Sequence, residues 1–240
     1  MERPFVICHI LASLDGRIDG AFFGAPETVP ALQAYAELRS QYECQAIVYG
    51  TTTMLDGYAD GKVGPLPAYL DTDSSLPLTD WVCAAGRTVG SYIVSVDPWG
   101  ELAFSSPIIQ RSGRPDAHII EVLTEAVSPA YLAYLQAQGI SYLFAGRDRL
   151  DCALLAHKLH ALFGVDRLMA AGGGILNASF LQAGLLDELS LVVAPVADGG
   201  NGAGLFGQAA FLPKTIPTAF HLTDAKRLPG DVLWLRYCRS

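Results

Sequence analysis

The stretch Ala170-Ala171-Gly172-Gly173-Gly174-Ile175-Leu176-Asn177 decides how this chain folds. It follows the run Arg167-Leu168-Met169 and precedes an amphipathic segment over residues 178–186, which is the order of a strand, a turn and a helix. Three consecutive glycines let the backbone approach a ligand closely, because no Cβ atom blocks it. The unpaired amides at the start of the following helix favour an anion, most often a phosphate. A plain tight turn is the alternative interpretation.

The composition of the whole chain indicates a folded protein that does not bind polyanions in general. Its 240 residues are 51% hydrophobic and 17% charged, which is enough apolar material for a sizeable core. The net charge of −8 argues against nucleic acid or an acidic membrane as a partner, since polyanions need a basic surface. No apolar run reaches the roughly 18–20 residues that span a bilayer, and no signal sequence is evident, so we expect a cytoplasmic protein.

Neither the cysteines nor the histidines have the spacing of a metal site. His157 and His160 lie three residues apart on a predicted helix with no third ligand nearby, which is typical of a solvated helix face. The cysteines are scattered and odd in number, which indicates reduced thiols, and they are Cys8, Cys44, Cys83, Cys152 and Cys238. We therefore expect no bound metal.

Strands and helices alternate along most of the chain. Strands are expected at residues 4–11, 46–49, 92–96, 117–123, 141–145, 167–171 and 188–195, with a terminal hairpin of 220–223 and 232–237. Helices are expected at 28–43 with Thr28 as N-cap, after the cap Ser128, and after the cap Asp151. Residues 57–77 are expected to form a long surface loop, and 97–100 a turn. This pattern predicts an α/β fold, a single domain over residues 1–240 with a mixed β-sheet flanked by helices on both faces.

Two further turns follow predicted strands and could bind a ligand. Gly50-Thr51-Thr52-Thr53-Met54 offers a glycine and hydroxyls to phosphate oxygens, although a threonine that caps a helix is the alternative. With the glycine triplet it suggests a dinucleotide along the carboxyl edge of the sheet. Ser13-Leu14-Asp15-Gly16-Arg17-Ile18 places a carboxylate and a guanidinium at the same edge, or forms a plain turn. His9 lies inside the first strand, where it is either a satisfied core histidine or a functional group beside a cleft.

Together these motifs resemble the reductase domain of bacterial and archaeal riboflavin biosynthesis, a family that shares its fold with dihydrofolate reductase. The matching segments span almost the entire chain and are residues 12–17, Arg39, 50–53, 94–97, 172–177, 179–189 and 194–196. The zinc-binding deaminase half of the bifunctional members has no counterpart here. The resemblance implies a dihydrofolate-reductase-like mixed sheet, NADPH as the hydride donor, and a homodimer.

The resemblance also implies roles for individual residues. The usual substrate is a pyrimidine with a phosphoribosyl chain that is reduced to a ribityl chain, as by 5-amino-6-(5-phosphoribosylamino)uracil reductase. Arg39 would contact the substrate, plausibly its phosphate. His9 stands where some members carry a substrate-facing lysine, and the proton would come from His9, from Asp15 or from an ordered water. The residues expected to contact NADPH are Ala12, Thr51, Thr53, Gly172, Gly173, Gly174, Ile175, Leu176 and Asn177.

Two departures from the family pattern concern the substrate side. Ala171 stands where the family usually has a glutamate that contacts substrate, and Asp56-Gly57-Tyr58 replaces the family's Asp-Asp-Pro. A site that hydrogen-bonds a particular polar substrate discriminates through such groups. An NADPH reductase acting on another small molecule, such as a pterin, and a nucleotide-binding module without catalysis are therefore alternatives. Arg87 and Arg147 are candidates to bind the 2′-phosphate of the cofactor.

Overall fold

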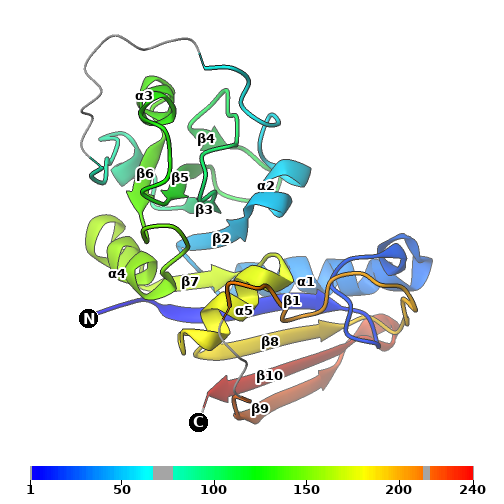
Figure 1. The fold of residues 1–240 in the computed structure, drawn as a ribbon. Coiled ribbons are helices and arrows are strands. Elements are labelled where there is room, and N and C mark those ends of the chain that lie inside the picture. Colours follow the sequence, from blue (N-terminus) through cyan, green and yellow to red (C-terminus); the bar gives the residue numbers. More distant parts are fainter. Residues whose placement is uncertain (1, 67–77, 213–216, 240) are drawn as a thin grey trace. The chain divides into compact units, whose positions relative to one another are not determined.

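A computed structural model describes residues 2–66, 78–212 and 217–239 of the chain (Figure 1). The chain divides into two compact units, and each is described by itself. Unit 1 comprises Met1–Pro4 and Gln45–Asp166, and unit 2 comprises Phe5–Cys44 and Arg167–Ser240. The single domain over residues 1–240 stays a prediction.

Unit 2 contains a mixed sheet in the strand order β7-β1-β8-β10-β9. Its strands are β1 (Phe5–Ala12), β7 (Arg167–Ala170), β8 (Glu188–Val193), β9 (Phe220–Arg227) and β10 (Leu233–Arg239). The central strand β1 runs parallel to β7 and β8, whereas β10 is antiparallel to both β8 and β9. Every residue of β1 after Phe5 is buried, so both faces of this strand are covered. Its helices are α1 (Val29–Gln41) and α5 (Gly174–Gln182), with short 3-10 turns at Ala21–Gly24, Pro26–Thr28 and Pro229–Asp231.

The strands of unit 1 also pair in a mixed pattern, which is mainly parallel. Its strands are β2 (Ala46–Gly50), β3 (Tyr92–Val96), β4 (Ile108–Ile109), β5 (Ala117–Leu123) and β6 (Ser141–Phe144). Parallel pairs join β2 to β3, β3 to β5 and β5 to β6, while β4 pairs antiparallel with β5. Its helices are α2 (Thr51–Gly57), α3 (Pro129–Ala137) and α4 (Cys152–Phe163), with a 3-10 turn at Gly86–Thr88. The predicted α/β class, with mixed strand pairing and flanking helices, is confirmed in both units.

Two of the three predicted helix caps are confirmed. Ser128 accepts a hydrogen bond from the amide of Tyr131, and Asp151 accepts two from the first turn of α4. Thr28 stands at the predicted N-cap position of α1, but its side chain makes no capping hydrogen bond. Because 3-10 turns lead into α1, Thr28 has a helical backbone conformation, and its hydroxyl donates to the carbonyl of Phe22 at 2.6 Å instead of accepting from an α1 amide.

The element boundaries differ from the expected ones in three places. Residues 51–57 form the helix α2 directly after β2, so the long loop predicted from residue 57 begins only after that helix. The helix after the glycine triplet starts at Gly174, so the third glycine is its first residue. The terminal hairpin extends through Arg227 in β9. Residues 67–77 of the predicted loop lie outside the described residues.

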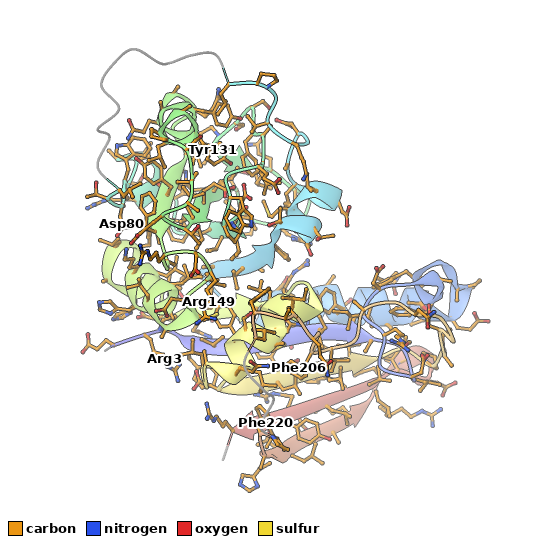
Figure 2. The ribbon with its side chains drawn as sticks, viewed as in Figure 1. Arg3, Asp80, Tyr131, Arg149, Phe206 and Phe220 are labelled. Carbon is orange, nitrogen blue, oxygen red and sulfur yellow. The ribbon has the colours of Figure 1, made fainter. Side chains whose placement is uncertain are left out.

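Unit 1 buries two neighbouring carboxyl groups. Glu121 on β5 has no exposed surface and lies in register with Ser95 on β3. Among the described residues, neither carboxyl oxygen of Glu121 has a hydrogen-bond partner. The Asp97 carboxylate is also buried, and it accepts hydrogen bonds from the amide of Leu102 at 2.9 Å and from Tyr131 on α3 (labelled in Figure 2) at 3.4 Å. Burial first, and the Asp97 charge second, raise the pKa of Glu121 well above its ordinary value.

Because the folded protein raises the pKa of Glu121 above that of the unfolded chain, the folded state loses stability as pH rises toward the folded pKa. We expect Glu121→Gln, which resembles the neutral acid in shape, to be more stable than the wild type at pH 8 by about 1 kcal/mol or more, and similar to it at pH 4. Urea unfolding at both pH values measures this difference. The exposed Glu125→Gln serves as the control. An E121Q variant that is no more stable at pH 8 than at pH 4, relative to wild type, would contradict the assignment.

Candidate active site

The glycine triplet lies between the end of β7 and the first turn of α5. Gly173 is the N-cap of α5 and has a φ of 57°, a left-handed value that favours glycine. A Cβ atom built on Gly173 would meet no atom within 4 Å, so open space lies beside it. Among the residues described, Asn177 Oδ1 is buried nearby on α5 without a hydrogen-bond partner. An exposed turn at a helix N-terminus, with no side chain in front, has the geometry of an anion-binding site.

Gly174 must be a glycine because another backbone segment packs directly against it. A Cβ atom on it would collide with the carbonyl oxygen of Gly204 and would lie 3.0 Å from the amide nitrogen of Gly207. The Gly207 amide donates to the carbonyl oxygen of Gly174 at 2.7 Å, and Asn177 Nδ2 donates to the Leu205 carbonyl at 3.1 Å. The start of α5 is therefore fixed by a segment about thirty residues later in the chain.

That segment, residues 196–207, also holds the turn of residues 13–18. The Leu14 amide donates to the carbonyl of Val196 at 2.8 Å, and the Arg17 guanidinium donates to the carbonyl of Gly202 at 2.8 Å. In Figure 1 the segment runs as an orange trace past α5, and it carries Phe206, which is labelled in Figure 2. The predicted Asp-Gly-Arg turn and the glycine triplet are thus parts of one connected structure.

Asp15 is the main link in this connection. Its carboxylate accepts hydrogen bonds from the Ser13 hydroxyl at 2.7 Å and from the amides of Asp198 and Gly199 at 2.8 and 3.0 Å. These donors, the Ser13 hydroxyl foremost, hold the pKa of Asp15 below its usual range. Asp15 is therefore ionised at neutral pH and accepts hydrogen bonds that connect residues 13–18 to residues 196–207. An ionised acceptor of this kind is disfavoured as a proton donor.

The sequence analysis missed residues 196–207 as part of this site. A signal was present, because glycines occur there at positions 199, 200, 202, 204 and 207. Two of them are required by close backbone approach, since a Cβ on Gly202 would collide with the Asp19 carbonyl, and a Cβ on Gly207 would lie 3.0 Å from backbone atoms of Gly174 and Ile175. A dense set of glycines without secondary structure thus marked a second close contact between backbone segments.

His9 is fully enclosed in unit 2. It has no exposed surface, its Nδ1 lies 2.9 Å from the Ser190 hydroxyl, and its Nε2 lies 3.0 Å from the carbonyl oxygen of Tyr35. Burial lowers the pKa of His9 to about 4, so the ring is neutral at physiological pH. These surroundings favour the satisfied core histidine over the proton donor, although the catalytic role of His9 stays a prediction.

The predicted substrate contact Arg39 lies half-buried on α1. Its guanidinium carbon lies 5.8 Å from the centre of the Tyr35 ring. Among the residues that the structure describes, no ion pair or hydrogen bond of this guanidinium is found. A guanidinium without an internal anion is available to an anionic ligand.

A partly buried ion pair fixes the end of α1 in the same unit. Arg236 on β10 binds both carboxylate oxygens of Glu188, at 2.8 and 2.9 Å, and the hydroxyl of Tyr42 donates to Glu188 at 2.6 Å. Although burial raises the pKa of Glu188, the hydrogen bonds from Arg236 and Tyr42 lower it below its ordinary value. Glu188 is therefore ionised and anchors the C-terminal cap of the helix that carries Arg39.

The remaining predicted cofactor residues divide between the units. Ala12 is buried at the carboxyl end of β1, and because β1 and β7 are parallel it lies at the same edge of the sheet as the triplet. In α5, Leu176 is buried and Ile175 is 47% exposed. In unit 1, the hydroxyl of Thr51 donates to the carbonyl of Val96 at 2.8 Å, and Thr53 is half-exposed on α2. Their contacts with a cofactor stay predictions.

In the described part of the chain, no group of three or more His, Cys, Asp or Glu side chains is placed to hold a metal ion. All five cysteines lie among the described residues and are free thiols. None of the helices that the structure describes is long and apolar enough to cross a membrane.

Residues 4–234 match the family described as the RibD C-terminal domain. A similar curated protein is the 2,5-diamino-6-ribosylamino-4(3H)-pyrimidinone 5′-phosphate reductase of Methanothermobacter thermautotrophicus, which is 30% identical over 203 residues, covering 84% of this chain and 82% of that protein. The reductase of the same name from Archaeoglobus fulgidus is 25% identical over 205 residues, covering 83% of this chain and 84% of that protein.

Two solved structures show that the fold is shared. RibD of Acinetobacter baumannii superposes with a TM-score of 0.66 at 21% identity, over 99% of this chain and 58% of that one, so this chain spans little more than half of its length. A pyrimidine reductase-like protein of Corynebacterium diphtheriae superposes with a TM-score of 0.69 at 18% identity, over 99% of this chain and 92% of that one. The fold expected from the motifs is confirmed, and the chain belongs to the RibD C-terminal domain family.

Proposed function

We propose that this protein is an NADPH-dependent reductase that acts on 2,5-diamino-6-ribosylamino-4(3H)-pyrimidinone 5′-phosphate and reduces its ribosyl chain to a ribityl chain. The observation that carries the proposal is the similarity to the Methanothermobacter reductase of that name, 30% identical over 82% of its length. A cytoplasmic location and a homodimer belong to the same proposal.

The residues at the start of α5 fit a dinucleotide phosphate. Gly173 leaves open space where any other residue would place a Cβ atom, and the first amides of a helix carry partial positive charge. In this proposal Gly172, Gly173 and Gly174 hold the pyrophosphate with the amides of Ile175, Leu176 and Asn177. Ala12, Thr51 and Thr53 would contact other parts of NADPH.

The chain's own groups would bind and orient the substrate. When bound, the nicotinamide supplies a hydride. Arg39, which has no internal anion among the described residues, would bind the substrate phosphate. Of the three proton sources expected from the sequence, His9 is neutral and enclosed and Asp15 is ionised and tied, so the surroundings of both favour the ordered water.

Ala171 motivates a second candidate function. It is 8% exposed and provides no carboxylate where the family usually has one, so a reductase that acts on a different small molecule remains a candidate. A nucleotide-binding module without catalysis is less favoured, because the curated relatives carry the names of reductases.

The decisive experiment follows NADPH oxidation at about 340 nm with the purified protein. The panel contains the diaminopyrimidinone 5′-phosphate, 5-amino-6-(5-phosphoribosylamino)uracil, the unphosphorylated form of each, and dihydropterins. Turnover of the diaminopyrimidinone phosphate supports the proposal. Turnover of a pterin alone would show that the protein is a reductase with a different substrate. NADPH binding without turnover of any compound would support a nucleotide-binding module without catalysis.

We expect Gly173→Asp to weaken NADPH binding by at least about 100-fold, because a carboxylate facing the pyrophosphate costs several kcal/mol. Gly173→Ala is the matched control, since it carries the same backbone strain at a φ of 57° without the charge. NADPH fluorescence titration measures the affinity, and urea unfolding checks that both variants are folded. A folded Gly173→Asp variant with wild-type affinity would remove the triplet from the cofactor site.

We expect Arg39→Ala to raise KM for the phosphorylated substrate by roughly 10- to 100-fold, the effect of losing a charge-assisted hydrogen bond, and to leave the Kd for NADPH unchanged. Arg39→Lys should recover part of the loss, because lysine keeps the charge without the planar guanidinium. Steady-state kinetics on the phosphorylated and unphosphorylated substrates measure the effect. An equal rise in KM for both substrates would show that Arg39 does not bind the phosphate.

A further inference from the structure

The face of α1 that carries Arg39 is attached to the sheet by polar contacts at two points. The Tyr35 carbonyl accepts a hydrogen bond from His9, and the Tyr42 hydroxyl donates to Glu188. Arg39 lies between these points, one turn after Tyr35. Because α1 is bonded to the sheet before and after Arg39, the backbone position of Arg39 is fixed.

Because the His9 ring is neutral, the hydrogen bonds around it have one consistent direction. A carbonyl oxygen only accepts, so His9 Nε2 carries the proton that it donates to Tyr35. His9 Nδ1 is then the acceptor, and the Ser190 hydroxyl donates to it. The Ser190 oxygen in turn accepts from the Trp234 indole nitrogen at 2.9 Å. The chain from Trp234 to Tyr35 is complete with a neutral ring, and it leaves no proton for a substrate.

The Tyr35 ring connects His9 to Arg39. It stacks on the imidazole with centroids 4.4 Å apart and an interplanar angle of 5°, and the Arg39 guanidinium carbon lies 5.8 Å from its centre. His9 thus fixes both the backbone and the ring of Tyr35, and Tyr35 offers its π-system to the cation. A protonated His9 would repel Arg39, since the two cations would lie on either end of this contact.

We propose that His9 and Tyr35 are positioning residues that hold the Arg39 guanidinium where it binds the phosphate of the substrate. This inference rests on the proposed function, because Arg39 is assigned to the phosphate there. It differs from the role expected for His9 from the sequence. In this proposal His9 does not donate the proton of the reaction. It restricts the motion of the Arg39 guanidinium through Tyr35, and Arg39 in turn selects a phosphorylated substrate.

The first test measures the mobility of Arg39 without any substrate. Nitrogen-15 relaxation at Arg39 Nε is compared in the wild type, Tyr35→Phe and Tyr35→Leu. We expect the wild type and Tyr35→Phe, which keeps the ring, to show similar order, and Tyr35→Leu to show a clear loss. Equal order in all three proteins would overturn the proposal. The half-buried Tyr35 is the main target, and His9→Phe, which keeps a ring but loses both hydrogen bonds, is the second variant.

The second test is a double-mutant cycle between Tyr35→Leu and Arg39→Ala. We expect Tyr35→Leu to raise KM for the phosphorylated substrate by about threefold to tenfold, the size of a cation–π contact, with kcat changed less than about twofold. In the Arg39→Ala background the same substitution should have no effect on KM, because its partner is already absent. Additive effects in the cycle would overturn the proposal.

His9 variants separate positioning from proton donation. Loss of a general acid lowers kcat by about 100-fold or more, whereas loss of positioning raises KM. We expect His9→Gln, whose amide can still donate to Tyr35, to keep kcat within a fewfold of the wild type. A kcat reduced by about 100-fold, with KM unchanged, would restore His9 as the proton donor. If the wild type failed to oxidise NADPH with any pyrimidine phosphate, the proposed function would be overturned. The nitrogen-15 relaxation of Arg39 is measured without substrate, so it tests the positioning role independently of that result.

Discussion

The candidate cofactor turn depends on two backbone segments that approach each other so closely that no side chain fits between them. Gly174 opens α5 directly against Gly204 and Gly207, and the hydrogen bond between Gly207 and Gly174 joins them. This contact fixes where α5 begins, and therefore where its free amides face. The neighbouring Gly173 makes no such contact, because a Cβ atom built on Gly173 would meet no atom within 4 Å. Two adjacent glycines thus have opposite surroundings: Gly173 faces open space, and Gly174 faces the protein's own backbone.

The polar interior of unit 2 has a comparable division of roles. Glu188 and Arg236 form a partly buried ion pair in which both carboxylate oxygens accept hydrogen bonds, while His9, Ser190 and Trp234 form a neutral hydrogen-bond chain. Both end on α1. A helix held by hydrophobic contacts alone could slide by small amounts, whereas these bonds specify its register. The helix that carries the predicted phosphate-binding arginine is therefore joined to the sheet by directional contacts at Tyr35 and Tyr42.

Much of the fold could be predicted from the sequence, because apolar periodicity and turn residues report local structure directly. The strands and the caps at Ser128 and Asp151 are examples. The partner of the Thr28 hydroxyl could not be predicted, because it is the Phe22 carbonyl in a 3-10 turn that gave no apolar pattern. The site was predicted where a motif marked it and missed where partners are distant in sequence. One example is Asp15, whose carboxylate accepts from the amides of Asp198 and Gly199. Another is His9, which stacks on the Tyr35 ring. Both contacts depend on packing that a single sequence does not display.

The pairing of β1 has a consequence for how the chain is made. This strand is formed by residues 5–12, but both of its neighbours, β7 and β8, lie beyond residue 166. During synthesis on a ribosome, an apolar strand from near residue 5 therefore emerges long before the strands that cover it. The residues of unit 1 between Gln45 and Asp166 can associate in that interval. Closure of unit 2 across such a separation is entropically costly and slow, so β1 stays without its neighbouring strands until the chain beyond residue 166 has been made.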